Sequence, residues 1–579
     1  MAESTHTSTP PLPPAAPPLG PAAAPLATAA PPSAGPRPWP TAIRSLARLL
    51  RAAAASSAPG GRGANRALVL VSLLIAAFAI NLDTTIVNVA LPTRGRKLHA
   101  SDSQLQWVVD AYNLVFAALL LACGGLSDKL GRKGVLLAGL AVFGLGSVAG
   151  GLTHTPGQLI AARCVMGLGA ALVFPATLSL ISNVFTERGE RARAIGLWGA
   201  TAGMAIALGP IVGGWLIERS SWPAIFFAMA PVAALGAALV GYAAPRSRDP
   251  QAPPADVRGF ALSTAAMALL TYTIIEAPEH GWGSARTLAS FAAALALLAG
   301  FVAWERRTRH PMLDVGLFRI PRFTAASASV TVAFFALFGF IFLMTQYFQF
   351  IKRYGPLSTG VHLLPVATAV GVSSVLGTKL AVRVGTKAVV AAGLLAMAGF
   401  YLWVAAAISP AYGYGAIAVQ MVVFGTGMGF TSAPATEAIM GVVPEARAGV
   451  GSAVNDATRL LGGTLGVAVI GSVYASLYGN RLASKLPAHL PAALARTTHQ
   501  SIGAALAVSG RLAAAGHAPL AAAVHSASTG AFIHGLSAGC VVAGALSLAG
   551  AAAVAALLPA QPPQQPDAAD TPSYEIAAA

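Results

Sequence analysis

Apolar segments long enough to cross a lipid bilayer recur along most of this 579-residue sequence. A membrane-spanning helix needs about 20 mainly apolar residues to cross roughly 30 Å of hydrocarbon. Fourteen segments meet this requirement: 66–92, 104–123, 134–153, 157–183, 191–217, 223–243, 258–277, 285–304, 322–350, 357–384, 386–407, 411–438, 447–477 and 530–558. Only 10% of the residues are charged, against about 25% in soluble domains. The chain is therefore predicted to be an all-α integral membrane protein with fourteen transmembrane helices, and a soluble multidomain enzyme is excluded.

The two ends of the chain differ from this apolar region. Residues 1–65 and 559–579 are rich in Pro and Ala, and such a composition buries too little apolar area to fold, so disordered tails are predicted. Residues 41–55 have the pattern of an amphipathic helix on the membrane surface or of a helical patch in a loose tail. Residues 478–529 form the only long loop between predicted helices, with its local structure left open. The three cysteines lie in apolar stretches, so neither a disulfide framework nor a metal site is predicted.

Basic residues gather in alternate loops. If the N-terminus is cytoplasmic, 24 of the 37 Lys and Arg residues fall on the cytoplasmic side of the predicted helices. This asymmetry agrees with the positive-inside rule and predicts a multi-pass protein of the cell membrane with both termini in the cytoplasm. The net charge of +17 is thus a consequence of topology, and no nucleic-acid partner is expected.

The loop between the second and third predicted helices reads GGLSDKLGRKG at 124–134. It resembles the signature G-x-L-x-D-R-x-G-R-K of the major facilitator superfamily. That resemblance implies two six-helix bundles, at 66–243 and 322–558, joined by a linker at 244–321 that contains two extra membrane helices. Gly131 permits a tight turn, and Asp128 and Arg132 are expected to act with it as a cytoplasmic latch between two transport states. The alternative is an ordinary basic turn.

The fifth predicted helix contains GMAIALGPIVGG at 203–214. This segment is similar to the G-P-x-x-G-G signature of superfamily exporters that exchange substrate for protons, and the resemblance favours export over uptake. Pro210 removes a backbone hydrogen bond and is expected to bend the helix. Gly209, Gly213 and Gly214 let neighbouring backbones approach closely, as a packing surface or a hinge requires.

Three charged residues in the first half are predicted to lie inside the membrane. Asp83, within NLDTTIVNVALP, belongs to a segment resembling the first helix of fourteen-helix drug:proton antiporters, and it is expected to bind a proton reversibly. Asp110 follows, in an Asp-x-Tyr pattern similar to that of exporters of quaternary ammonium compounds, and would share an anionic cavity with Asp83. Arg163 lies in a second signature and requires a partner or a water-filled cavity. The alternatives are a cap near the interface for Asp83, exposure to outside water for Asp110, and a surface-reaching side chain for Arg163.

The second half of the sequence contains a further intramembrane acid. Asp456 and Arg459 lie three residues apart in the thirteenth predicted helix and can pair on one face. If they pair, they form a structural element more than a free proton site. The aromatic residues Tyr347, Phe348 and Phe350 would either line a drug site or pack in the core.

Together these features predict a secondary exporter, not an enzyme, that exchanges protons for lipophilic cations or other small molecules. No phosphate-binding G-x-x-x-x-G-K-[ST] loop occurs, so a proton gradient and no cofactor is expected to drive transport. A monomer in the lipid bilayer is expected. Two other functions remain open from the sequence: export of an endogenous metabolite, and a membrane sensor or scaffold that transports nothing.

Overall fold

The computed structural model describes residues 63–98, 101–247, 256–309, 311, 313, 315–442 and 448–558. Regular structure within these residues is entirely helical. The predicted surface helix at 41–55 lies outside them, as do the predicted tails except for residues 63–65, which begin the first described helix.

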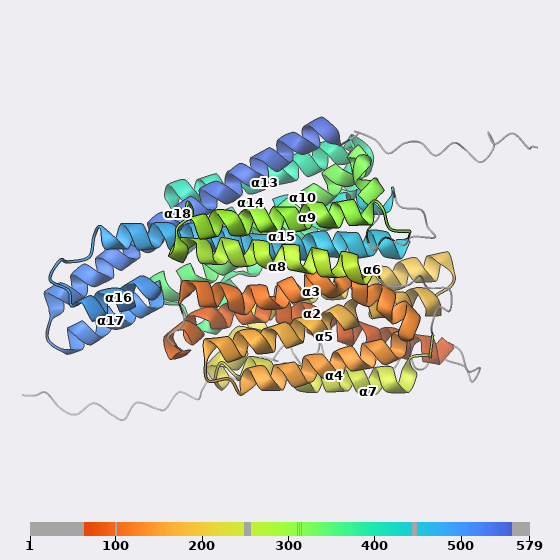
Figure 1. The fold of residues 1–579 in the computed structure, drawn as a ribbon, viewed down its shortest axis with the longest axis horizontal. Helices are drawn as coiled ribbons and strands as arrows, with labels where there is room; N and C mark the ends of the chain where they lie inside the picture. Colours follow the sequence, from red (N-terminus) through yellow and green to blue (C-terminus); the bar gives the residue numbers. More distant parts are fainter. Residues whose placement is uncertain are drawn as a thin grey trace, which may run out of the picture. The chain divides into compact units, whose positions relative to one another are not determined.

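Six long helices make up the N-terminal half (Figure 1). They are α2 (Gly63–Leu98), α3 (Asp102–Leu130), α4 (Arg132–Gly151), α5 (Pro156–Val184), α6 (Arg188–Arg219) and α7 (Ala224–Ala243). Two of them begin with a capping box: the side chains of Ser101 and Thr155 accept from backbone N–H groups of α3 and α5, which would otherwise have no partner. Within this half, α5 packs against both α3 and α4.

Two helices, α8 (Val257–His280) and α9 (Ala285–Glu305), follow and pack against each other. The remaining helices form the C-terminal half. They are η1 (Val315–Arg319), α10 (Pro321–Gln346), the π-helical η2 (Tyr347–Ile351), α11 (Pro356–His362), α12 (Leu364–Val384), α13 (Thr386–Ala407), α14 (Tyr414–Met440), α15 (Ala448–Ala483), α16 (Ala492–Gln500), α17 (Ile502–Ala514) and α18 (Ala518–Leu557).

The all-helical membrane fold is confirmed. Twelve helices in the described residues are long and apolar enough to cross a membrane, and α6 adds a thirteenth if its two bent parts form one span. Helix α3 is not among these, but it is 29 residues long and lies beside α5 and α15. Each of the fourteen predicted segments overlaps one observed helix, or two consecutive ones. Length and apolarity by themselves give twelve or thirteen spans in the described residues, not fourteen.

The segment 478–529, which the sequence left as a loop, is mostly helical. Helix α15 continues to Ala483, α16 and α17 follow, and α18 begins at Ala518. Tyr478 Oη donates to the Thr498 carbonyl oxygen at 3.1 Å. A small apolar core joins these helices; its buried members are Leu490, Val508, Leu512, Ala521 and Val524. We call the end of the membrane helices next to α16 and α17 the capped end (Figure 1).

Helices of the two halves pack against each other along two seams. Helix α3 lies against α15, and α6 lies against α11. Helix α8 contacts both α3 and α15, so the pair α8–α9 is attached to both halves. Buried polar side chains gather near the first of these seams, which therefore positions the candidate site.

Candidate functional site

Asp83 and Arg163 form an ion pair inside the N-terminal half. Asp83 lies on α2 and Arg163 on α5, and Arg163 Nη1 donates to Asp83 Oδ2. Both side chains are buried, with 0% of Arg163 and 1% of Asp83 exposed. Because an isolated charge loses several kcal/mol of solvation on burial, each of these two charges makes the burial of the other tolerable. The predicted requirement of Arg163 for a partner is met.

Helix α3 completes the surroundings of Arg163. Arg163 Nε donates to the Val108 carbonyl oxygen at 3.0 Å, and its guanidinium carbon lies 4.2 Å from the ring centroid of Tyr112. Tyr112 Oη in turn donates to the Ile80 carbonyl oxygen on α2 at 3.0 Å. A single guanidinium group thus links α2, α3 and α5, and its side chain does not reach toward a membrane surface.

Asp110 lies on a different face of α3. Asp110 is two residues after Val108 and two before Tyr112. Two residues correspond to a rotation of about 200° around the helix axis, so Asp110 points away from the side on which Tyr112 contacts Arg163. Its side chain is 0% exposed, so it does not face outside water in this conformation, and neither carboxylate oxygen has a hydrogen-bond partner among the described residues. The structure therefore separates Asp83 and Asp110 onto opposite sides of α3 instead of grouping them around one cavity.

Two residues beside Asp110 escaped the sequence analysis. Gln106 and Asn113 are each 1% exposed, and Gln106 Nε2 and both amide atoms of Asn113 have no hydrogen-bond partner in the described part of the chain. They lie four residues before and three residues after Asp110, the spacing that places side chains on one helix face. That spacing was the available indication in the sequence.

Helix α6 is bent by 42° between its parts Arg193–Ile206 and Leu208–Arg219, close to Pro210. Pro210 has no N–H, so the Ile206 carbonyl oxygen loses its ordinary helical donor. Thr85 on α2 replaces it: its Oγ1 donates to that oxygen at 3.0 Å. A Cβ added at Gly209 would overlap Thr85 Oγ1, so glycine is what allows this bond to form. The expected bend is present, and α2 stabilises it.

Replacing Thr85 with alanine should lower the stability of the folded protein, because the Ile206 carbonyl oxygen would then have no donor. An unsatisfied buried acceptor costs about 1–3 kcal/mol. Thr84→Ala is the control, since the Thr84 hydroxyl donates to the Ile80 carbonyl oxygen of its own helix at 3.1 Å and interacts with the Tyr112 phenol of α3, not with α6. Thermal unfolding of both purified variants would measure the difference. Equal unfolding temperatures would contradict this role of Thr85.

The other glycines of the 203–214 segment face different neighbours. A Cβ at Gly213 would lie 2.8 Å from Ile86 Cγ1 on α2, within the same half. At Gly214 it would overlap the Pro356 carbonyl oxygen and would lie 2.5 Å from Leu357 Cα, both on α11 of the other half. Glu218 adds to this seam, because its Oε1 accepts from the Leu357 N–H at 2.9 Å. The glycine signature therefore lies where α6 passes between α2 and α11.

Asp456 and Arg459 are paired on α15, as their spacing suggested. Arg459 Nη1 lies 3.9 Å from Asp456 Oδ1, and Arg459 Nη2 donates to Thr436 Oγ1 on α14 at 3.1 Å. Thr436 Oγ1 in turn donates to Asn455 Oδ1 at 3.1 Å. The guanidinium also lies 5.3 Å from the ring centroid of Phe334 on α10. This network connects three helices of the C-terminal half, an arrangement typical of a structural element.

The signature at 124–134, expected as a loop, covers the end of α3, Gly131 and the start of α4, so only Gly131 lies between the two helices. Gly131 has φ +111°, a backbone conformation that residues with a side chain rarely adopt. The Arg132 N–H donates to the Ser247 carbonyl oxygen at 3.0 Å, and Lys133 Nζ donates to the Gly241 carbonyl oxygen at 2.8 Å. The turn is thereby held against the end of α7. The side chain of Asp128 lies outside the described part of the structure, so its expected role in the latch stays a prediction.

The aromatic residues of the second half pack in the interior. Tyr347 and Phe348 are 0% exposed and Phe350 is 6% exposed. Phe348 stacks on Tyr354 with 5.6 Å between ring centroids, and the His362 ring lies 4.4 Å from that of Tyr354. Core packing therefore describes these side chains in this conformation.

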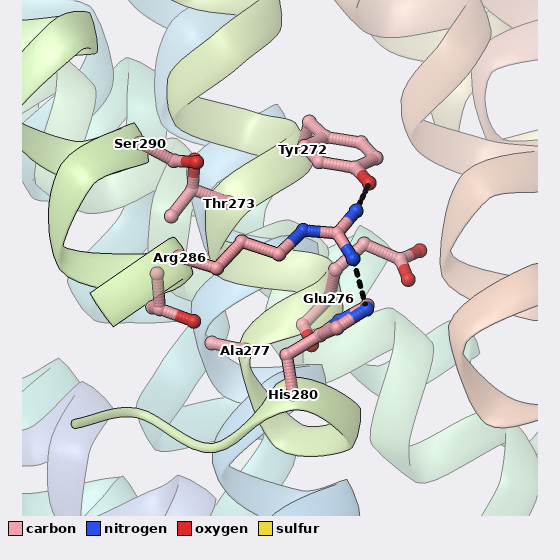
Figure 2. Close-up of a pocket in the computed structure, with 8 residues that line it drawn as sticks. Tyr272, Thr273, Glu276, Ala277, His280, Arg286 and Ser290 are labelled. Atoms are coloured by element: carbon pink, nitrogen blue, oxygen red, sulfur yellow. Dashed lines mark hydrogen bonds between the residues drawn. The ribbon is translucent and has the colours of Figure 1, made fainter. Parts of the chain in front are cut away.

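A shallow pocket lies between α8 and α9 (Figure 2). Figure 2 shows Arg286 reaching from α9 toward Tyr272 and His280 on α8, with 2.9 Å from its Nη2 to Tyr272 Oη. Glu276, also in the lining, accepts from Trp107 Nε1 at 3.2 Å and so ties α8 to α3. The empty volume is about 200 Å³. Drug-sized ligands occupy pockets of roughly 300–1,000 Å³, so this pocket is too small for such cargo.

Buried charges inside a bundle of membrane-crossing helices define a membrane transporter, because such charges mark ion and substrate pathways. Residues 73–467 match the family model of the Major Facilitator Superfamily. The chain belongs to this superfamily of transporters. It is therefore a multi-pass transporter of the cell membrane and not an enzyme.

The chain is also similar to several curated bacterial proteins. It is 37% identical to the multidrug resistance protein Stp of Mycobacterium tuberculosis over 70% of this chain and 75% of that protein. It is 33% identical to the multidrug efflux pump LfrA of Mycolicibacterium smegmatis, over 84% and 95%. Among solved structures, the chain resembles a bacterial homologue of the human lysosomal transporter Spinster in an inward-facing, occupied conformation. The TM-score is 0.62 and the sequence identity 16%, and the match covers 85% of this chain and 97% of that one. The last similarity supports the fold alone.

Proposed function

We propose that the protein exports lipophilic, cationic drugs from the cell in exchange for protons. The observation that supports this most is the buried ion pair between Asp83 and Arg163. The Asp83 carboxyl group can take up a proton, and Arg163 connects it to α3 and α5 as well as to α2. Its relatives include proteins named for multidrug efflux and for methylenomycin A resistance, which places drug export among the functions of similar chains. The protein is proposed to act as a monomer without a cofactor.

Protonation of Asp83 would change the structure through Arg163. A neutral carboxyl group no longer attracts a guanidinium strongly, so the link between α2, α3 and α5 weakens when the proton binds. The charge of Arg163 then favours a new arrangement of these helices. When the proton leaves, the pair forms again and restores the first arrangement. Proton binding and conformation are coupled in this way, as antiport requires.

Asp110 would supply the negative charge for a cationic cargo. Its carboxylate has no hydrogen-bond partner within the residues that the structure describes, whereas that of Asp83 is already neutralised by Arg163. A lipophilic cation reaching Asp110 would therefore gain a charge partner that the closed structure lacks. Asp456 is paired with Arg459, which makes it a structural residue in this proposal.

The movement itself would be a rocking of two bundles, residues 66–243 and 322–558, about the seams between them. Pro210 and Gly214 lie at one such seam, against α11 near the capped end, and Gly209 and Gly213 lie beside them against α2. The turn with Asp128, Gly131 and Arg132 lies at the other end of α3 and would act as a latch there. We orient the protein with both termini and the latch in the cytoplasm and with the capped end outside the cell.

The direct test uses purified protein in liposomes with an imposed pH gradient and a panel of compounds. Cationic dyes such as ethidium and uncharged antibiotics of similar size would be compared. We expect gradient-dependent movement of the cations, with release of protons from the detergent-solubilised protein when a cation binds. Transport of uncharged compounds alone would contradict the cationic cargo, and transport that ignores the pH gradient would contradict proton coupling.

A further inference from the structure

A stripe of polar side chains follows one face of α3. Its members, Asp102, Gln106, Asp110 and Asn113, are spaced by four, four and three residues, which keeps them on the same side of the helix. They are 6%, 1%, 0% and 1% exposed. Apolar residues normally occupy such buried positions, so a continuous polar stripe requires an explanation.

The stripe faces α15, in the seam between the two halves. A Cβ added at Gly471 of α15 would overlap the side-chain amide of Gln106, and Ser472 Oγ donates to Gln106 Oε1 at 3.5 Å. Asp102 is close enough to Tyr474 and Tyr478 to act on both phenols electrostatically. A different face of α3 packs on α5, where a Cβ at Gly167 would lie 2.6 Å from the Tyr112 carbonyl oxygen. The stripe therefore runs from the capped end toward the membrane interior.

Most side-chain polar atoms of the stripe have no hydrogen-bond partner among the residues described. The unpartnered atoms are Asp102 Oδ1, Gln106 Nε2, both carboxylate oxygens of Asp110 and both amide atoms of Asn113. Each buried polar atom without a partner costs about 1–3 kcal/mol. A row of them on one helix face is stable when small polar ligands fill the row, and water is the ligand that such sites normally hold.

We propose that this stripe is a proton path between the capped end and Asp110, where a proton and the cationic cargo would compete for one carboxylate, and that Asp102 is its terminal proton-binding carboxylate. The proposal rests on the proton-coupled export proposed above. Asp102 and Asp110 are eight residues apart, about 12 Å along the helix, a gap that two or three waters bridge. The amides of Gln106 and Asn113 both donate and accept hydrogen bonds, so they orient such waters along the row.

Asp102 is well placed for proton exchange at the end of the path. It is the first residue of α3, and its neighbours on α15 are phenols rather than cations, so no guanidinium or ammonium group neutralises it among the described residues. On α8, the titratable group near this end of α3 is Glu276, whose Oε1 accepts from Ser103 Oγ at 3.3 Å. A drug-sized cation does not fit the path, because Gln106 already fills the space against Gly471.

The test compares two modes of transport in proteoliposomes, with ethidium as the probe. One mode is efflux driven by a pH gradient, and the other is exchange of labelled for unlabelled ethidium at equal pH, which needs no net proton movement. Asp102→Asn and Gln106→Leu should slow gradient-driven efflux by about tenfold or more while exchange stays within about twofold of wild type. Asp102→Glu, which keeps the carboxyl group, should retain gradient-driven efflux. Ser103→Ala, which alters the neighbouring face, should change neither mode.

The outcomes separate this path from the proposed function. Wild-type protein that exchanges ethidium but ignores the pH gradient would overturn proton coupling, and the path with it. A gradient-driven wild type whose Asp102→Asn and Gln106→Leu variants match it would overturn the path alone. Equal losses of exchange and gradient-driven efflux would assign the stripe to helix packing and would also overturn the path.

Discussion

Replacing Arg163 with alanine should greatly lower the fraction of protein that is folded, because Asp83 would be left as a buried charge without its partner. Breaking a buried ion pair on one side costs about 3–5 kcal/mol, a large part of the stability of a typical domain. The double variant Asp83→Asn/Arg163→Gln removes both charges and should recover much of that stability. It should nevertheless fail in proton-driven transport, since the titratable group is gone. Thermal unfolding and proteoliposome efflux measure the two effects separately.

Arg459→Ala is the matched control for this pair. Arg459 is 31% exposed and lies 3.9 Å from Asp456, so its loss leaves a carboxylate that water can reach more easily. The expected decrease in stability is therefore smaller than for Arg163→Ala. A double variant with wild-type transport would contradict the coupling role of Asp83. Equal destabilisation by the two single Arg variants would contradict the importance of full burial.

Replacing Gly214 with valine should abolish transport while leaving each half folded. The new side chain would overlap the backbone of α11 at Pro356 and Leu357, which belongs to the other half, so the two halves could no longer close at the capped end. Overpacking of this kind costs about 1–3 kcal/mol, which shifts a two-state equilibrium by roughly 5- to 150-fold. Proteoliposome efflux would measure transport, and thiol labelling of a cysteine introduced at Ser358 would measure opening of the capped end.

Two variants of the same helix serve as controls. Gly203→Val adds the same side chain where a Cβ meets no atom within 4 Å, and it should leave both transport and labelling unchanged. Gly213→Val meets Ile86 within the N-terminal half, so it should lower thermal stability instead of exposing Ser358. Labelling of Ser358→Cys at the wild-type rate in the Gly214 variant would contradict the proposed movement about this seam.

The helices themselves were predictable from the sequence to within a few residues in most cases. The predicted segment 386–407 coincides with α13, and 157–183 differs from α5 by one residue at each end. The exception is 478–529, because α17 is apolar but too short to span a membrane and α16 is both short and polar. Their core forms only when α16 and α17 fold against the ends of α15 and α18, so contacts between distant residues decide this structure.

The charged residues of the candidate site stand out in the sequence, but their arrangement and their uncharged neighbours Gln106 and Asn113 do not. An acid or an arginine within an apolar segment stands out in the sequence, which led to Asp83, Asp110, Arg163 and Asp456. Asp456 and Arg459 pair within one helix, so their spacing alone foretold the contact. Asp83 and Arg163 are 80 residues apart, and no local pattern links them.

The sequence by itself determined that this chain crosses the membrane as helices, because a backbone in hydrocarbon must satisfy its hydrogen bonds within its own segment. It also determined which side chains are charged inside the membrane. Only the tertiary structure decided which of those charges is neutralised, since that depends on which face each helix turns to its neighbours. Arg163 meets Asp83 on one side of α3, and Asp110 lies on another, facing the seam with α15, with no partner in the described ranges.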